Sequence, residues 1–138
     1  KHLDLSTETL DGTRGFKING GAGYFGGSVS TAGDINKDGY ADFMVGAYGS
    51  ANNKVYVIYG GEKSKMSSLD VTTLDPKTTG FIIKGNSEND NFGISVNVAG
   101  DFNKDGHLDI IIGASEKDPL KGKAYLIHNG IDFYSSNI

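Results

Sequence analysis

The feature that most constrains this chain is an internal repeat with a period of 67 residues. Four short motifs recur at this offset without a gap. A fixed period of tens of residues is typical of propellers, solenoids and other arrays of one supersecondary unit. The recurring pairs are Phe25-Gly26 with Phe92-Gly93, Gly33-Asp34 with Gly100-Asp101, Asp38-Gly39 with Asp105-Gly106, and Gly46-Ala47 with Gly113-Ala114.

The repeat extends beyond this core with small changes in length. Leu3-Asp4-Leu5 corresponds to Leu69-Asp70-Val71, and Val55-Tyr56-Val57-Ile58 corresponds to Ala124-Tyr125-Leu126-Ile127. Nearly the whole chain is therefore covered by two units. We expect the first repeat to span residues 1–66 and the second to span residues 67–138.

Each repeat is expected to form four short strands. Residues 94–98 alternate between apolar and polar side chains, as in a half-buried strand, while residues 43–45 and 110–112 are continuously apolar. β-Branched and aromatic residues mark a third strand in each repeat, and residues 16–18 and 81–83 are candidates for a fourth. Twenty-one glycines against two prolines indicate many tight turns. The predicted fold is all-β, with two four-stranded units of the size of a β-propeller blade.

Composition limits the possible partners. The net charge is −4 and the basic residues are scattered, which argues against a nucleic-acid surface. The apolar runs are strand-sized, so no membrane span is expected in this segment. Without cysteine the chain has neither disulfides nor thiolate metal sites. It opens at Lys1 without a leader pattern, so the numbering begins either after a processed signal or inside a longer chain.

The recurring segments 34–42 and 101–109 have the composition of calcium loops. Oxygen-bearing side chains occupy positions 1, 3, 5 and 9, with glycine at position 6. Calcium takes six to eight oxygen ligands, and alternate residues of a tight loop can all point inward. The backbone carbonyl at position 7 should add a ligand, while the lysine at position 4 should face solvent. The predicted ligands are Asp34, Asn36, Asp38, Tyr40 and Asp42 in the first loop, and Asp101, Asn103, Asp105, His107 and Asp109 in the second.

Three other interpretations of these loops are possible. An EF-hand requires glutamate at position 12, where these loops have Val45 and Ile112. Magnesium is disfavoured because it keeps its waters and takes few protein ligands. A plain hairpin turn also uses Asp, Asn and Gly, but three carboxylates within nine residues repel one another without a cation. We therefore predict two Ca²⁺ sites, whose four positive charges would balance the formal net charge.

In these motifs the chain resembles the FG-GAP repeat family, whose members include the blades of the integrin α-subunit propeller. The Phe-Gly and Gly-Ala pairs match, with a calcium loop between them, although the proline that usually follows Gly-Ala is Tyr48 or Ser115 here. The resemblance implies that the calcium loops join the first two strands of each blade on one side of the propeller. It places ligand contacts on the other side, in residues 20–24, 48–53, 85–91 and 115–122, where Tyr24 and Tyr48 are the suggestive residues.

These features predict a calcium-stabilised binding or adhesion module at an extracellular or cell-surface location, which recognises a protein or a glycan. No catalytic set is expected, because His2, His107 and His128 are far apart in the sequence and the loop carboxylates are assigned to metal. Two blades cannot close a propeller, so we expect either a homo-oligomer or the remainder of a longer chain. The alternative functions are a carbohydrate-binding lectin propeller and a propeller appendage of a larger extracellular enzyme.

Overall fold

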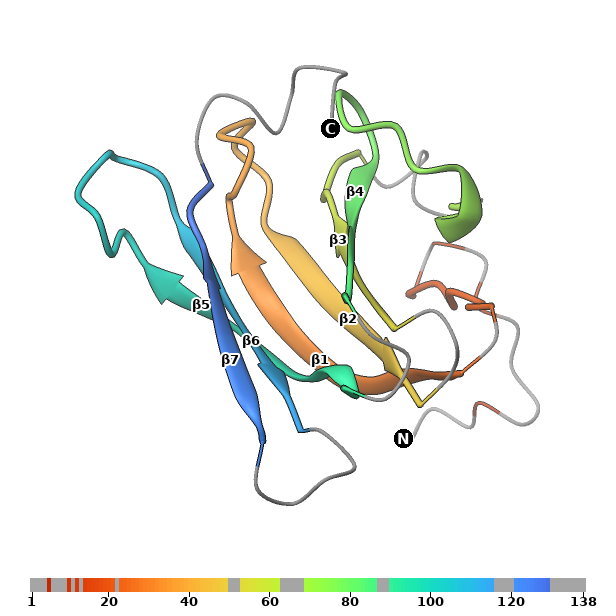
Figure 1. The fold of residues 1–138 in the computed structure, drawn as a ribbon. Helices are drawn as coiled ribbons and strands as arrows, with labels where there is room; N and C mark the ends of the chain where they lie inside the picture. The colour runs from red at the N-terminus through yellow and green to blue at the C-terminus, as the bar shows by residue number, and fades with distance from the viewer. Residues whose placement is uncertain are drawn as a thin grey trace.

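The computed structural model describes residues 5, 10, 12, 14–21, 23–49, 53–62, 69–86, 90–115 and 121–129. Within them the chain forms two antiparallel sheets and a single turn of 3₁₀ helix, which confirms the predicted all-β fold (Figure 1). The first sheet contains β1 (Tyr24–Gly33), β2 (Asp42–Tyr48), β3 (Lys54–Ile58) and β4 (Gly80–Lys84) in that order. The second contains β5 (Phe92–Gly100), β6 (Asp109–Ala114) and β7 (Lys123–Ile127). The helix η1 (Val71–Thr73) lies between β3 and β4.

The two sheets share one pairing register. Val29 of β1 faces Val45 of β2, and their counterparts Val96 and Ile112 face each other in the same way. Register shifts also recur, between residues 25 and 28 in β1 and between residues 92 and 95 in β5. The glycine of each Phe-Gly pair lies in this irregularity with a φ of 85° or 89°, a conformation that glycine adopts without a steric penalty. The Phe-Gly motif therefore encodes a bulge at the start of each sheet.

The fourth strand of the first sheet comes from late in the sequence. β4 pairs with β3 and lies after the predicted boundary between residues 66 and 67. The first sheet therefore spans that boundary, which itself stays a prediction. The strand expected at residues 16–18 is wrong, because residues 14–21 have no strand assignment. A strand needs a hydrogen-bonded neighbour, and the free side of β3 is already occupied by β4.

Two apolar clusters hold these strands. The larger one lies between the sheets and combines Met44, Val55 and Val57 of the first with Ile110 and Ile112 of the second. The smaller one covers the opposite face of the first sheet, where Val45, Tyr56 and Ile58 are packed with residues from η1 and its flanks. The apolar runs that the sequence analysis singled out thus bury both faces of β2, as expected for a central strand.

The connections between strands divide between the two ends of the sheets. The β1–β2 and β5–β6 hairpin loops, which are the predicted metal loops, lie at one end (Figure 1). The last residues of β2 and β6 and the first residues of β3 and β7 lie at the opposite end (Figure 1). Parts of the predicted ligand loops, together with His2, lie outside the described residues. Within the part of the chain that the structure describes, no helix has the length and apolar character needed to cross a membrane.

Candidate metal centre

Each predicted metal loop is folded around the carboxylate at its first position. In the first loop, Asp34 Oδ1 accepts a hydrogen bond from the N–H of Asp38 at 2.9 Å, and Oδ2 accepts one from the N–H of Gly39 at 2.9 Å. Gly39 has a φ of 91°, and Lys37 lies in the left-handed region with a φ of 61°. The glycine at position 6 is therefore required where the backbone turns back toward the first aspartate.

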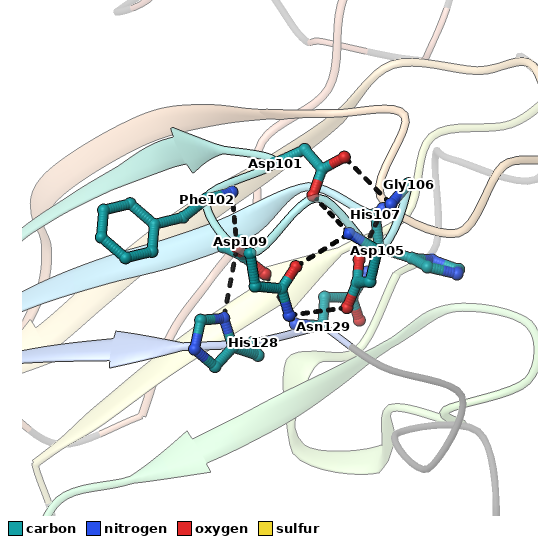
Figure 2. Close-up of polar contacts among 9 residues, drawn as sticks. Asp101, Phe102, Asp105, Gly106, His107, Asp109, His128 and Asn129 are labelled. Atoms are coloured by element: carbon teal, nitrogen blue, oxygen red, sulfur yellow. Dashed lines mark hydrogen bonds and ion pairs between the residues drawn. The ribbon is translucent and has the colours of Figure 1, made fainter.

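The second loop repeats this arrangement atom for atom. Asp101 Oδ1 and Oδ2 accept from the N–H groups of Asp105 and Gly106, each at 2.9 Å (Figure 2). Lys104 takes a φ of 62° and Gly106 a φ of 85°, close to the values in the first loop. Identical residues at identical spacing have thus produced the same local structure twice.

The residues at positions 3 and 5 complete the loop. Asn36 Oδ1 accepts from the N–H of Asp38 at 3.1 Å, while Asn36 Nδ2 donates to Asp38 Oδ2 at 2.8 Å. Asp38 Oδ1 in turn accepts from the N–H of Tyr40 at 2.9 Å. The corresponding bonds at Asn103 and Asp105 measure 3.1, 2.9 and 2.8 Å. Positions 1, 3 and 5 are therefore gathered on one side of each loop.

The aspartate at position 9 is different, because it is buried and also accepts a hydrogen bond from a residue outside the loop. Asp42 accepts from the N–H of Ile35 at 2.8 Å and from the N–H of Gly60, just after β3, at 2.7 Å. Asp109 accepts from the N–H of Phe102 at 2.8 Å and from the N–H of Asn129, just after β7, at 3.1 Å. Position 9 therefore links the start of each loop to the end of the third strand of its sheet.

The two buried aspartates differ in their acidity. Burial raises the pKa of Asp42, and the hydrogen bonds from Gly60 and Ile35 only partly oppose this effect. Burial also acts to raise the pKa of Asp109, but the N–H groups of Phe102 and Asn129, together with His128, outweigh burial and lower it. His128 Nδ1 lies 3.3 Å from Asp109 Oδ2. The pKa of Asp105 is lowered as well, first by its hydrogen bond with the Asn103 side chain.

Sequence reasoning missed His128 as a member of the site. The sequence shows it only as one of three histidines far apart along the chain, whereas the structure places its ring against Asp109. Its counterpart in the first sheet is Tyr59, whose hydroxyl donates instead to the carbonyl of Pro76 at 3.2 Å. The backbone donors Gly60 and Asn129 were also missed. They could not be found from the loop motif alone, since they follow a different strand.

The donor chemistry of both loops fits a hard divalent cation. A carboxylate oxygen that accepts one N–H bond keeps a second lone pair for a metal, and this applies to Asp34 and Asp101. The described residues contain no group of three or more acidic, histidine or cysteine side chains converging as a ready-made site. The structure instead closes each loop by hydrogen bonds, so the ligand set, including the carbonyls of Tyr40 and His107, stays a prediction.

The two loops also touch each other. Lys37 at position 4 of the first loop is exposed, as expected, and its Nζ lies 3.5 Å from His107 Nε2 in the second loop. Asn129 Nδ2 donates to the carbonyl of Ile35 at 2.9 Å, which is a second link between the two repeats at this end of the molecule. A conformational change in one loop can therefore reach the other loop through these two contacts.

Comparison with known protein families matches the FG-GAP repeat at residues 25–58 and 92–127, which together cover half of the chain. The chain belongs to the FG-GAP repeat family. Both matched segments run from the Phe-Gly bulge through the metal loop to the third strand. The two sheets of this FG-GAP chain are accordingly β-propeller blades, with four strands in the first and three described in the second.

Curated relatives of this FG-GAP chain include a phospholipase and integrin alpha subunits. Rat phosphatidylinositol-glycan-specific phospholipase D is 34% identical over 110 residues, which are 75% of this chain and 12% of that protein. Chicken integrin alpha-6 is 35% identical over 105 residues, which are 75% of this chain and 9% of that protein. Human integrin alpha-6 is 32% identical over 126 residues, which are 85% of this chain and 10% of that protein. The chain thus spans about a tenth of the length of these relatives.

Proposed function

We propose that this chain is a calcium-stabilised β-propeller module that binds a protein or glycan partner and has no catalytic role of its own. The observation that carries the proposal is the pair of loops with the same residues and the same hydrogen bonds, one in each blade. A bound Ca²⁺ would offset two of the three carboxylate charges of each loop. Because the ninth aspartate is also tied to the end of the third strand, a cation would stiffen the sheet as well as the hairpin.

Calcium binding is measured by titration calorimetry on chelator-treated protein. We expect two Ca²⁺ per chain with millimolar or tighter affinity, the range of extracellular modules, and a gain in melting temperature since only the folded loops bind. Asp34→Ala and Asp101→Ala should each remove one site. A stoichiometry of zero in wild-type protein, with the fold intact by circular dichroism, would refute the proposal. Measured affinities in this range would support the proposed extracellular or cell-surface location.

The partner is proposed to bind at the end of the sheets opposite the metal loops. Tyr24 and Tyr48 meet there with ring centroids 5.5 Å apart, and Tyr24 is well exposed. Exposed aromatic rings supply large contact areas with little loss of side-chain entropy. Tyr24→Ala and Tyr48→Ala should weaken binding to a captured partner without lowering calcium binding. Unchanged partner binding in both variants would move the recognition surface elsewhere.

Two narrower functions remain as alternatives. A lectin propeller is favoured by the same tyrosine pair, and saturable binding on a glycan array that is lost in Tyr24→Ala would select it. An appendage of a larger extracellular enzyme is favoured by the similarity to a phospholipase D over 12% of its length. Further blades are needed in every case, and they come either from other copies of the chain or from the remainder of a longer one.

A further inference from the structure

Asn129, just after β7, makes two hydrogen bonds that go to different blades. Its backbone N–H donates to Asp109 Oδ1 of the second loop at 3.1 Å. Its side-chain Nδ2 donates to the carbonyl of Ile35 in the first loop at 2.9 Å. Both bonds are buried, and Asn129 itself is 1% exposed. One residue therefore contacts both predicted metal loops, one through its backbone and the other through its side chain.

The first blade shows that these two bonds are independent, because glycine occupies the equivalent position there. Ile58 and Ile127 hold the same place in the third strands of the two sheets, so Gly60 corresponds to Asn129. The N–H of Gly60 donates to Asp42 at 2.7 Å, which is the same bond to a ninth-position aspartate. That bond needs only a backbone N–H group. The side chain of Asn129 therefore adds a contact that the first blade does not make from this position.

The residue that accepts this contact, Ile35, lies between the two predicted ligands Asp34 and Asn36. Its N–H donates to the buried Asp42 at 2.8 Å, and its carbonyl accepts from Asn129. Its side chain is 1% exposed and belongs to the apolar cluster between the blades. The peptide groups on both sides of Ile35 are thus held by buried bonds, which restricts the backbone next to both ligands.

The amide of Asn129 is buried although only part of it is paired. Because a carbonyl oxygen can only accept, the Ile35 carbonyl fixes which end of the amide is Nδ2. The other end, Oδ1, is buried and has no hydrogen-bond partner within the part of the chain that the structure describes. An unpaired buried acceptor disfavours the fold, so an apolar side chain would serve packing better at this position. The favourable contribution of the amide is its bond to the first loop.

We propose that Asn129 is a positioning residue for the first calcium site, and that its side chain raises the calcium affinity of a loop in the other blade. The inference rests on the calcium binding proposed above. The affinity of oxygen-ligand loops depends on the rigidity of the site as well as on its charge. Groups that orient metal ligands from outside the coordination shell commonly account for about 10–100-fold in metal affinity. We call the hydrogen bond between Asn129 and Ile35 the cross-blade bond.

The other polar contact between the loops is less suited to this role. Lys37 Nζ lies 3.5 Å from His107 Nε2, but this contact is exposed and water competes with it. The cross-blade bond is shorter and buried, and a hydrogen bond is stronger in the protein interior than in water. The order of the first loop should therefore depend on the cross-blade bond.

The test measures the two sites separately in the full chain. Asp101→Ala leaves only the first site, and Asp34→Ala leaves only the second. Asn129→Ala removes the amide but keeps the backbone N–H that donates to Asp109, and Asn129→Leu does the same with a side chain of similar size. By titration calorimetry, both Asn129 variants should weaken calcium binding about tenfold in the Asp101→Ala background. In the Asp34→Ala background the affinity should be unchanged.

Ser28→Ala is the matched control. Ser28 Oγ donates to the carbonyl of Gly93 at 2.6 Å, so this variant also removes a bond from a side chain to a carbonyl between the blades. Because Ser28 lies outside both loops, the affinities of both sites should stay at their wild-type values. A loss at the first site as large in Ser28→Ala as in Asn129→Ala would attribute the effect to general loosening of the blades and overturn the inference.

A second measurement follows the order of the loop without calcium. In chelator, amide hydrogen exchange measured by NMR should be faster at Ile35 and Asn36 in Asn129→Ala than in the wild-type chain. Exchange at Phe102 and Asn103, the counterparts in the second loop, should be unchanged. The same acceleration at all four amides would indicate global destabilisation and contradict a local effect on the first loop.

The calorimetry separates a failure of this inference from a failure of the proposed function. Wild-type protein that binds two Ca²⁺, with the first site equally tight in both Asn129 variants, would refute only the positioning role. Wild-type protein that binds no Ca²⁺ would refute the proposed calcium role and the inference with it. A selective loss at the first site, with faster exchange confined to that loop, is the result expected.

Discussion

Two aspartates of the first loop, Asp42 and Asp38, should respond differently when they are replaced by alanine in the absence of calcium. Asp42 is buried and accepts hydrogen bonds from the N–H groups of Ile35 and Gly60. Asp38 is exposed, and its bonds stay within the loop. We predict that Asp42→Ala destabilises the fold strongly even in chelator, whereas Asp38→Ala acts mainly by removing calcium.

The magnitudes follow from what each substitution leaves behind. Asp42→Ala deprives two N–H groups of their acceptor, and each unsatisfied buried group costs about 1–3 kcal/mol. Burial raises the pKa of Asp42, so the carboxylate itself is disfavoured there, and the net loss should lie near the lower end, at about 2–3 kcal/mol. Water can replace the exposed bonds of Asp38, which limits the loss in chelator to about 1 kcal/mol or less.

The assay is urea unfolding followed by circular dichroism, with each variant measured in chelator and in calcium. At a hundredfold excess of calcium over its dissociation constant, an intact site adds about 2.7 kcal/mol to the free energy of unfolding. Each variant lacks one site and should lose one such contribution. The same comparison between Asp109→Ala and Asp105→Ala provides a replicate in the second loop. Equal stabilities of Asp42→Ala and Asp38→Ala in chelator would refute the structural role given to position 9.

Three further predictions concern the rest of the fold. Gly46→Ala should lower the free energy of unfolding by about 1–3 kcal/mol, because the added Cβ would overlap the carbonyl oxygen of Gly93 in the facing blade. Gly61→Ala is the control, because no atom lies within 4 Å of the Cβ added there. Asn129→Ala should cost about 1–3 kcal/mol in urea unfolding by removing the side-chain bond between the repeats. The Thr72 hydroxyl and N–H lower the pKa of Asp70, so its stabilising effect is present above a pH of about 4 and is lost as the pH falls further. Asp70→Asn should therefore weaken the acid dependence of the melting temperature, and an unchanged pH profile would contradict this.

The fold was largely predictable because each repeat shows the same motifs and the same strand patterns, so each predicted strand is supported by its counterpart. The Phe-Gly pairs, the apolar run at residues 43–45 and the hairpin loops all fall where the sequence placed them. The expectation at residues 16–18 was wrong for a reason that local pattern cannot show. Its side chains resemble those of β4, but the edge of β3 accepts only one strand, and β4 occupies it.

The residues of the two loops could be singled out from sequence, although their role as metal ligands stays a prediction, and their surroundings could not be predicted. Spacing within nine residues determines which side chains can gather in a loop, so Asp34 and Asp38 were found from sequence alone. Gly60 and Asn129, which donate to Asp42 and Asp109, come from other segments, and the pairing of Asp109 with His128 depends on tertiary structure. The opposite pKa shifts of the two ninth-position aspartates were beyond sequence reasoning for the same reason, since the loop motifs match position for position.

The common register of the two sheets has a consequence for how such chains change length in evolution. A duplication of one full repeat inserts a sheet whose two faces already match the faces on either side of it. A single residue inserted within a strand would instead turn the apolar side chains beyond it toward water, whereas the loops accept small changes in length, as the two repeats themselves show. Gene duplication in this lineage should therefore add or remove complete blades, and homologous chains should differ by whole repeats rather than by single strands.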